Sequence, residues 1–107
     1  MEMGYILVFN DVMIKQLKKA GKNQHIKEIL TKMLDKLEFF GPDAGELLDS
    51  QLAVYEVKIK HPPIRLYFKH NKPTNEIYVF EFEMKTSPEK QKATIIKIKR
   101  KASGLKS

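Results

Sequence analysis

The chain has 107 residues, of which 20 are Lys or Arg and 13 are Asp or Glu, so its formal net charge is +7. Hydrophobic residues make up 42%, enough for one packed core, which argues against a wholly disordered chain. The absence of cysteine excludes disulfides and thiolate zinc sites. No apolar run approaches the ~20 residues of a membrane helix, and the N-terminus does not resemble a secretory signal. We therefore expect one cytoplasmic domain over residues 1–107, with a frayed tail at 103–107.

The positive charge is unevenly distributed along the chain. Residues 1–84 hold 12 basic and 12 acidic residues, which cancel. Residues 85–107 hold eight basic residues and a single acid, Glu89. A cluster of this kind indicates an anionic partner, which could be nucleic acid or an acidic protein.

The N-terminal third predicts a strand followed by a helix. Tyr5–Phe9 is rich in β-branched and aromatic residues, as strands are. Asn10 or Asp11 can cap a helix that runs to about Ala20, where Gly21 is a suitable end.

A second helix is predicted over His25–Phe40, because its apolar residues recur at helical spacing. Gly41-Pro42 ends it, and the short link after the first helix makes a helical hairpin. The stripe consists of Ile26, Ile29, Leu30, Met33, Leu34 and Leu37.

From Val54 onward the period changes to two, which predicts three strands at 54–60, 64–69 and 76–85. Short connections between them favour an antiparallel meander. In the third run we expect one face to hold Tyr78, Phe80, Phe82 and Met84. The other face should hold Ile77, Val79, Glu81, Glu83 and Lys85. Together these elements predict an α+β fold, with four strands, an N-terminal helical hairpin and a C-terminal helix.

The last helix should begin at Ser87-Pro88-Glu89, which combines a capping hydroxyl, a proline suited to the first turn and an acid. Its buried stripe is either Ala93, Ile96 and Lys97 or Ile95, Ile98 and Ala102. The β-branched run Thr94–Ile98 also suits a strand, but the capping signal favours a helix.

Polar residues gather on the predicted non-core face of the meander. Arginine can bind a phosphate with two parallel hydrogen bonds, lysine adds a point charge, and glutamate or tyrosine can transfer protons. Interleaved charges are also typical of a solvated sheet face, which is the interpretation that the residue pattern alone favours. The three histidines lie in three different segments, so we expect no metal site. The face collects Glu56, Lys58, Lys60, Arg65, Tyr67, Lys69, Glu81, Glu83 and Lys85.

Four short motifs between Leu52 and Ala102 carry a family likeness. They are Tyr55–Ile59, Ile64–Phe68, Ile77–Phe80 and Met84–Glu89. In order and spacing they resemble the RelE/ParE toxin superfamily, in particular its HigB-like, phage-derived branch. The resemblance implies the toxin of a type II toxin–antitoxin pair, a ribosome-dependent mRNA endonuclease that works by 2′-OH attack without metal or cofactor. It also implies an antitoxin partner, expected to carry a helix-turn-helix, and contacts with the ribosome and mRNA.

By position, the resemblance implies that Lys58, Arg65 and Lys85 bind and stabilise the scissile phosphate. Tyr67 or Glu56 would transfer protons. Further nucleic-acid contacts are expected from Lys60, Lys69, Lys90, Lys92, Lys97 and Arg100.

The chain also departs from the family pattern. Phe80 stands where many HigB-like members have a histidine, Gln91 where the family has a tyrosine, and Glu56 where some relatives have lysine. These departures keep two alternatives open. One is a non-catalytic binding module of the same fold, such as a DNA gyrase inhibitor or a degenerate toxin. The other is a general basic nucleic-acid-binding protein.

Overall fold

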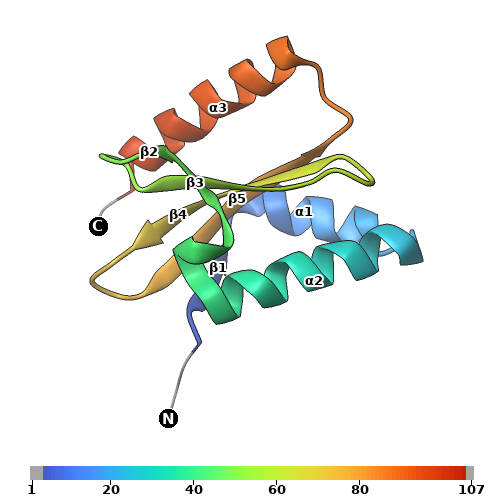
Figure 1. The fold of residues 1–107 in the computed structure, drawn as a ribbon, viewed down its shortest axis with the longest axis horizontal. Coiled ribbons are helices and arrows are strands. Elements are labelled where there is room, and N and C mark those ends of the chain that lie inside the picture. The colour runs from blue at the N-terminus through green and yellow to red at the C-terminus, as the bar shows by residue number, and fades with distance from the viewer. Residues whose placement is uncertain (1–3, 106–107) are drawn as a thin grey trace.

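The computed structural model describes residues 4–105 and contains one mixed five-stranded sheet between two helical layers (Figure 1). The strands lie in the order β1-β5-β4-β3-β2, with β1 parallel to β5 and the other neighbours antiparallel. None of the described helices is long and apolar enough to cross a membrane. The elements are β1 (Ile6–Phe9), α1 (Asp11–Ala20), α2 (Gln24–Phe40), the short 3-10 helix η1 (Gly41–Ala44), β2 (Glu46–Asp49), β3 (Val54–Ile59), β4 (Ile64–Asn71), β5 (Glu76–Met84) and α3 (Pro88–Ser103).

The α+β class and the predicted helices are confirmed, but the sheet has five strands where four were predicted. The additional strand is β2, four residues long, which pairs with β3 at the sheet edge. Its adjacent Leu47 and Leu48 break the alternation by which a half-buried strand is recognised, so the sequence pattern does not reveal it.

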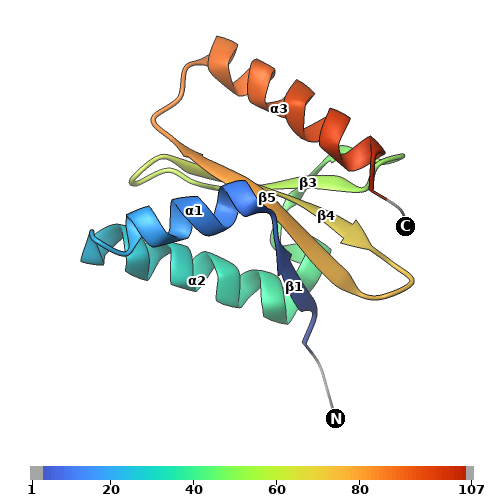
Figure 2. The ribbon, with the colours of Figure 1, turned by 180° about the vertical axis from the view of Figure 1, so that it is seen from behind.

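Local signals position the helical hairpin on one face of the sheet (Figure 2). The side chain of Asn10 accepts a hydrogen bond from the Val12 amide at 2.8 Å, which confirms the predicted N-cap. At the end of α2, Gly41 has a φ of 60°, and a Cβ there would lie 2.4 Å from the Tyr5 ring. Gly41 is therefore required both by its backbone conformation and by the close approach of Tyr5.

A first core fills the space between the hairpin and the sheet. The α2 stripe supplies Leu30, Met33 and Leu37, all buried. Residues of β3, β4 and β5 meet them from the sheet, namely Val57, Ile64, Leu66, Phe68, Ile77, Val79 and Phe82. The apolar periodicity of the sequence thus identifies this layer of packing correctly.

A bulge in β5 changes which side chains share a face. Tyr67 pairs with Glu81 and Phe68 pairs with Val79, so Phe80 is an extra residue opposite β4. A β-bulge of this kind shifts the alternation by one position.

The predicted faces of β5 are therefore wrong on either side of the bulge. Tyr78 and Phe80 lie on the α3 side, whereas Phe82 and Met84 lie with the first core. Likewise, Ile77 and Val79 belong to the first core and do not share a face with Glu81 and Glu83.

A second, smaller core lies between the sheet and α3. Ser87 caps this helix by accepting a hydrogen bond from the Lys90 amide at 3.2 Å, as predicted. The buried members are Val54, Tyr67, Phe80, Ile98 and Ala102, with Ile95 and Leu105 packed beside them. The second of the two predicted α3 stripes is therefore correct. Within the predicted frayed tail, Ser103 ends α3 and Leu105 packs on this core, while residues 106–107 lie outside the described chain.

We expect the two neighbouring isoleucines of α3 to differ sharply in their effect on stability. Ile98 is fully buried, whereas Ile96 is 58% exposed. Ile98→Ala should lower the free energy of unfolding by about 2–4 kcal/mol, because it leaves a cavity in the second core. Ile96→Ala should change it by less than about 0.5 kcal/mol. Urea unfolding of both variants measures the difference, and equal effects would contradict this placement of α3.

Candidate functional site

A cavity of about 270 Å³ opens where the ends of β3, β4 and β5 meet the loop into α3. In Figure 1 this is the right-hand side, where the β3–β4 turn lies below the loop that leads into α3. Three of the predicted phosphate-binding or nucleic-acid-binding cations line it together. The lining residues are Lys58, Ile59, Lys60, Pro63, Ile64, Arg65, Glu83 and Thr86.

Strand register brings the charged groups of this cavity together. Lys58 lies directly opposite Arg65 on β4, and Arg65 lies directly opposite Glu83 on β5. Directly opposed residues of antiparallel strands have their Cβ atoms about 4.5–5.5 Å apart. The three side chains therefore form a row across the sheet, with two cations followed by one carboxylate.

Arg65 is held in place by the buried carboxylate of Glu56. Its Nη1 donates a hydrogen bond to Glu56 Oε2 at 2.7 Å, and this is also an ion pair between a 29% exposed arginine and a 5% exposed glutamate. A guanidinium has five donors, so this contact orients Arg65 and leaves further N–H groups for a ligand. Glu56, predicted to transfer protons, is in the structure the partner that orients Arg65.

Tyr67 is fully buried, which corrects the prediction that it stands on an open face. Its hydroxyl donates a hydrogen bond to Glu83 Oε2 at 2.8 Å. Burial raises the pKa of Tyr67 well above its ordinary value of 10.0, and the hydrogen bond to Glu83 raises it further. Tyr67 is therefore placed to support Glu83 from inside the protein and does not reach the cavity.

Glu83 was placed on the polar face by the sequence pattern but was not assigned a specific site role, and it is part of the cavity lining. It is buried, accepts the Tyr67 hydrogen bond on Oε2, and accepts a second hydrogen bond on Oε1 from the Thr94 hydroxyl of α3. Its position opposite Arg65 was the available signal, but the bulge in β5 conceals that register in the sequence. Thr86 was missed as well, because it lies in the link between β5 and α3 and shows no periodic pattern.

Lys85 lies beside the cavity and is not part of its lining. Its backbone has a φ of 52°, which is uncommon for a residue with a side chain. The Lys85 amide donates a hydrogen bond to the Pro63 carbonyl oxygen at 3.1 Å, which ties it to the β3–β4 turn. Strained backbone of this kind tends to cluster at functional sites.

The remaining predicted nucleic-acid contacts fall into two groups. Lys69 is buried and donates to the Leu52 carbonyl oxygen at 2.6 Å, while Lys97 donates to Glu81 at 3.0 Å. Lys69 is thus engaged inside the protein, because α3 covers the face that was expected to be solvated, whereas Lys97 is about half exposed and pairs with the buried Glu81. Lys90, Lys92 and Arg100 are exposed on α3, and none of the three forms an ion pair within residues 4–105.

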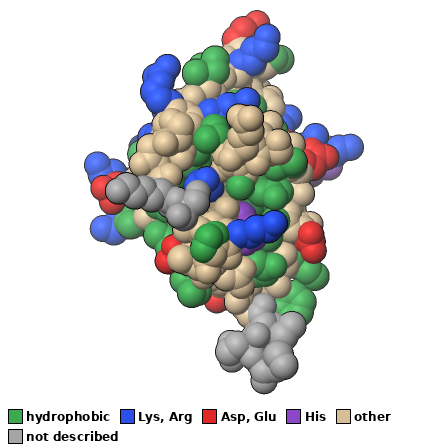
Figure 3. Space-filling model, turned by 90° about the vertical axis from the view of Figure 1, so that its left-hand side faces the viewer, with side chains coloured by type: hydrophobic (Ala, Val, Ile, Leu, Met, Phe, Trp, Pro, Cys, Tyr) green, Lys and Arg blue, Asp and Glu red, His purple; other side chains and the backbone are tan. Residues whose placement is uncertain are grey.

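Chemically, the cavity suits an anion. Lys58, Lys60 and Arg65 outnumber the one carboxylate, and the Thr86 hydroxyl adds a neutral polar group. Within the described part of the chain, no group of three or more His, Asp or Glu side chains could hold a metal ion. On the side of the molecule drawn in Figure 3, basic and acidic side chains are interspersed and do not form one continuous basic patch.

Known proteins resemble this chain in fold. No protein-family model and no curated protein sequence matches the chain, but several solved structures match it over most of its length. The isolated RelE toxin of E. coli matches with a TM-score of 0.61 at 19% identity, over 88% of this chain and 98% of that chain. A free-state E. coli RelE mutant, with two arginines replaced by alanine, matches with a TM-score of 0.65 at 21% identity, over 90% and 99%.

The RelBE2 toxin–antitoxin complex of Mycobacterium tuberculosis matches with a TM-score of 0.63 at 11% identity, over 81% of this chain and 98% of that chain. The chain therefore has the fold of RelE toxins.

The buried Tyr67 hydroxyl predicts a specific loss of stability in alkali. Because its pKa is raised on folding, its contribution to the free energy of unfolding is complete below pH 10.0, the ordinary value. Above that pH the unfolded tyrosine ionises while the folded one does not, so stability falls by up to about 1.4 kcal/mol per pH unit. Urea unfolding between pH 8 and pH 11 should show a smaller fall for Tyr67→Phe than for the wild type. Identical pH profiles would contradict the burial of this hydroxyl.

Proposed function

We propose that this protein is a RelE-type toxin that cleaves mRNA on the ribosome, in the cytoplasm, and that it belongs to the HigB-like branch. The observation that carries the proposal is the row of Lys58 and Arg65 beside Glu83 in a cavity of about 270 Å³. The RelE toxin fold supports it, because the cavity lies on the sheet of that fold.

In the proposed reaction the 2′-OH of a nucleotide attacks the adjacent phosphorus. A new O–P bond forms, the bond to the 5′ oxygen of the next nucleotide breaks, and a 2′,3′-cyclic phosphate and a 5′-OH remain. Negative charge builds up on the phosphate oxygens in the transition state. Arg65, Lys58 and Lys85 are the groups proposed to stabilise that charge.

Two proton transfers accompany this reaction, because the 2′-OH loses a proton and the leaving 5′ oxygen gains one. We assign Glu83 as the proton acceptor, since it is the carboxylate among the residues that line the cavity. Lys58 is the proposed donor, as a protonated amine in the same cavity. Tyr67 is not given a catalytic role because it is buried, and Glu56 is given the positioning of Arg65.

An antitoxin protein is the proposed partner, expected to carry a helix-turn-helix. RelE-fold neighbours from E. coli and M. tuberculosis are described as toxin–antitoxin complexes, which supports an antitoxin for this chain as well. The exposed cations Lys90, Lys92 and Arg100 of α3 are proposed to contact the RNA of the ribosome or the message.

The second candidate function is a non-catalytic binding module, such as a DNA gyrase inhibitor. The burial of Tyr67, and the presence of Phe80 where many HigB-like members have a histidine, favour it, because neither residue can supply the proton transfer expected at this site. Gyrase trapped on DNA, with translated mRNA left intact, would establish this function in place of the nuclease.

The test of the nuclease is Arg65→Ala combined with Lys85→Ala, assayed by in vitro translation and primer extension. The wild type should produce cuts at preferred codons in translated mRNA. The double variant should cut at least about 100-fold more slowly, because two phosphate-stabilising charges are lost. Lys15→Ala with Lys22→Ala, two exposed residues on the hairpin side, is the charge-matched control and should cut normally. Unchanged cleavage by the Arg65 and Lys85 variant would overturn the site assignment.

A further inference from the structure

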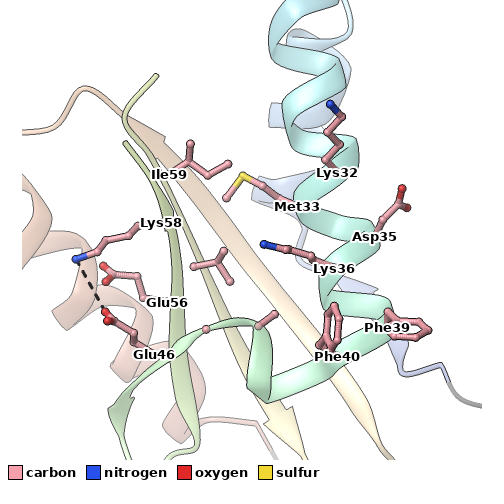
Figure 4. Close-up of a pocket in the computed structure, with 13 residues that line it drawn as sticks. Lys32, Met33, Asp35, Lys36, Phe39, Phe40, Glu46, Glu56, Lys58 and Ile59 are labelled. Carbon is pink, nitrogen blue, oxygen red and sulfur yellow. Dashed lines mark ion pairs between the residues drawn. The ribbon is translucent and has the colours of Figure 1, made fainter. Parts of the chain in front are cut away.

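Three buried glutamates lie on the α3 side of the sheet, Glu56 on β3 and Glu81 and Glu83 on β5. Figure 4, a view into the cavity between α2 and β3, shows Glu56 pointing to the side of β3 away from α2. Glu56 pairs with Arg65 at 2.7 Å, and Glu81 pairs with Lys97 at 3.0 Å. Within the described chain, Glu83 forms no ion pair. A buried carboxylate without a cation depends on hydrogen bonds from neutral groups.

The neutral donors to Glu83 come from two different elements. The Tyr67 hydroxyl of β4 donates to Oε2 at 2.8 Å, and the Thr94 hydroxyl of α3 donates to Oε1. Because each oxygen has its own donor, the two contacts together fix the plane of the carboxyl group as well as its position. A carboxylate has about four lone-pair sites, so each oxygen keeps one for the cavity that Glu83 lines.

Thr94 occupies a position of α3 that packing alone would give to an apolar residue. Thr94, Ile98 and Ala102 recur at intervals of four and are the buried residues of this helix. Ile98 and Ala102 pack in the second core, whereas the Thr94 hydroxyl is used on Glu83. Thr94 is 7% exposed and does not line the cavity, so it can affect a ligand there only through Glu83.

The charged groups around Glu83 leave it available to accept a proton. Arg65 lies directly opposite Glu83 on β4, but its guanidinium is engaged by Glu56. A carboxylate paired with a cation is a weaker proton acceptor, because the pair stabilises its unprotonated form. The charged groups that face Glu83 or share its surroundings are Arg65 of β4, Lys58 and Lys60 of β3, Glu81 of β5, and the Glu81 partners Lys97 and Lys101 of α3.

We propose that Thr94 is a positioning residue for Glu83, whose carboxylate it holds toward the 2′-OH of an RNA bound in the cavity. The proton of the 2′-OH passes to a Glu83 oxygen, and Thr94 itself does not touch the RNA. The inference rests on the proposed nuclease function and extends the site to α3. No residue of α3 is among the described residues that line the cavity.

The test is single-turnover cleavage of mRNA on programmed ribosomes, with the ribosome concentration varied. Thr94→Val keeps nearly the same shape but removes the hydroxyl, and it should lower the maximal rate at least about tenfold. The half-saturating ribosome concentration and the affinity for an uncleavable 2′-O-methyl message should stay within about twofold, because the phosphate-binding cations are unchanged. Thr94→Ser keeps the hydroxyl and should cleave within about threefold of the wild type.

The pH dependence of cleavage gives a second readout of the same contact. Removing a donor to an unprotonated carboxylate strengthens its hold on a proton, so more alkaline conditions are needed to free the base. The acidic limb of the pH–rate profile should therefore move up by about one pH unit in Thr94→Val. Tyr67→Phe removes the donor to the other oxygen and should move the limb in the same direction. Thr94→Ser should leave it in place.

Ile98→Val is the control for a general loosening of α3, because it trims the second core one turn further along without touching Glu83. It should keep the wild-type rate and pH profile. If Thr94→Val does not fold, judged by circular dichroism, Thr94→Cys replaces it, since a thiol is only a weak donor.

An unchanged rate and pH profile in the Thr94 variant, or an equal loss in Ile98→Val, would overturn the positioning role while the nuclease function stands. A wild type that leaves translated mRNA intact would instead overturn the nuclease, and this inference with it.

Discussion

The structure depends on how the polar face of the sheet is covered. Helix α3 lies across a face that carries glutamates as well as apolar residues, and the buried carboxylates there must be hydrogen-bonded or paired. Glu83 meets this requirement by accepting from Tyr67 on β4 and Thr94 on α3, and Glu81 by pairing with Lys97. These contacts fix α3 over the sheet, and the cavity opens at its N-terminal end.

The same constraint divides the basic residues into two groups. Three lysines of α3 form ion pairs within the protein. Lys97 and Lys101 pair with Glu81, and Lys99 lies 3.7 Å from Asp49. Lys90, Lys92 and Arg100 are left for solvent or a ligand. The positive charge available to attract an anion is therefore smaller than the net charge of +7 indicates. The cavity adds cations of its own from the β3–β4 hairpin.

Much of the fold could be predicted from the sequence, because the relevant signals are local. The apolar stripe of α2, the cap at Asn10 and the cap at Ser87 each depend on residues within one or two turns. The bulge at Phe80 and the short strand β2 could not be predicted, since each interrupts the regular alternation of apolar and polar residues by which a strand is recognised. The proximity of Lys58 and Arg65 followed from the meander. The burial of Tyr67 and Lys69 did not, because it depends on where α3 packs.

In the proposed function, the cavity between Lys58, Arg65 and Glu83 binds an RNA phosphate. The most direct test of this binding is an NMR titration of the isotope-labelled protein with a short 2′-O-methyl RNA, which cannot be cleaved by 2′-OH attack. The largest amide shifts are expected on Lys58, Arg65 and Thr86, three residues that line the cavity. Shifts confined to the exposed face of α3 around Lys90, Lys92 and Arg100, with none at the cavity, would contradict it.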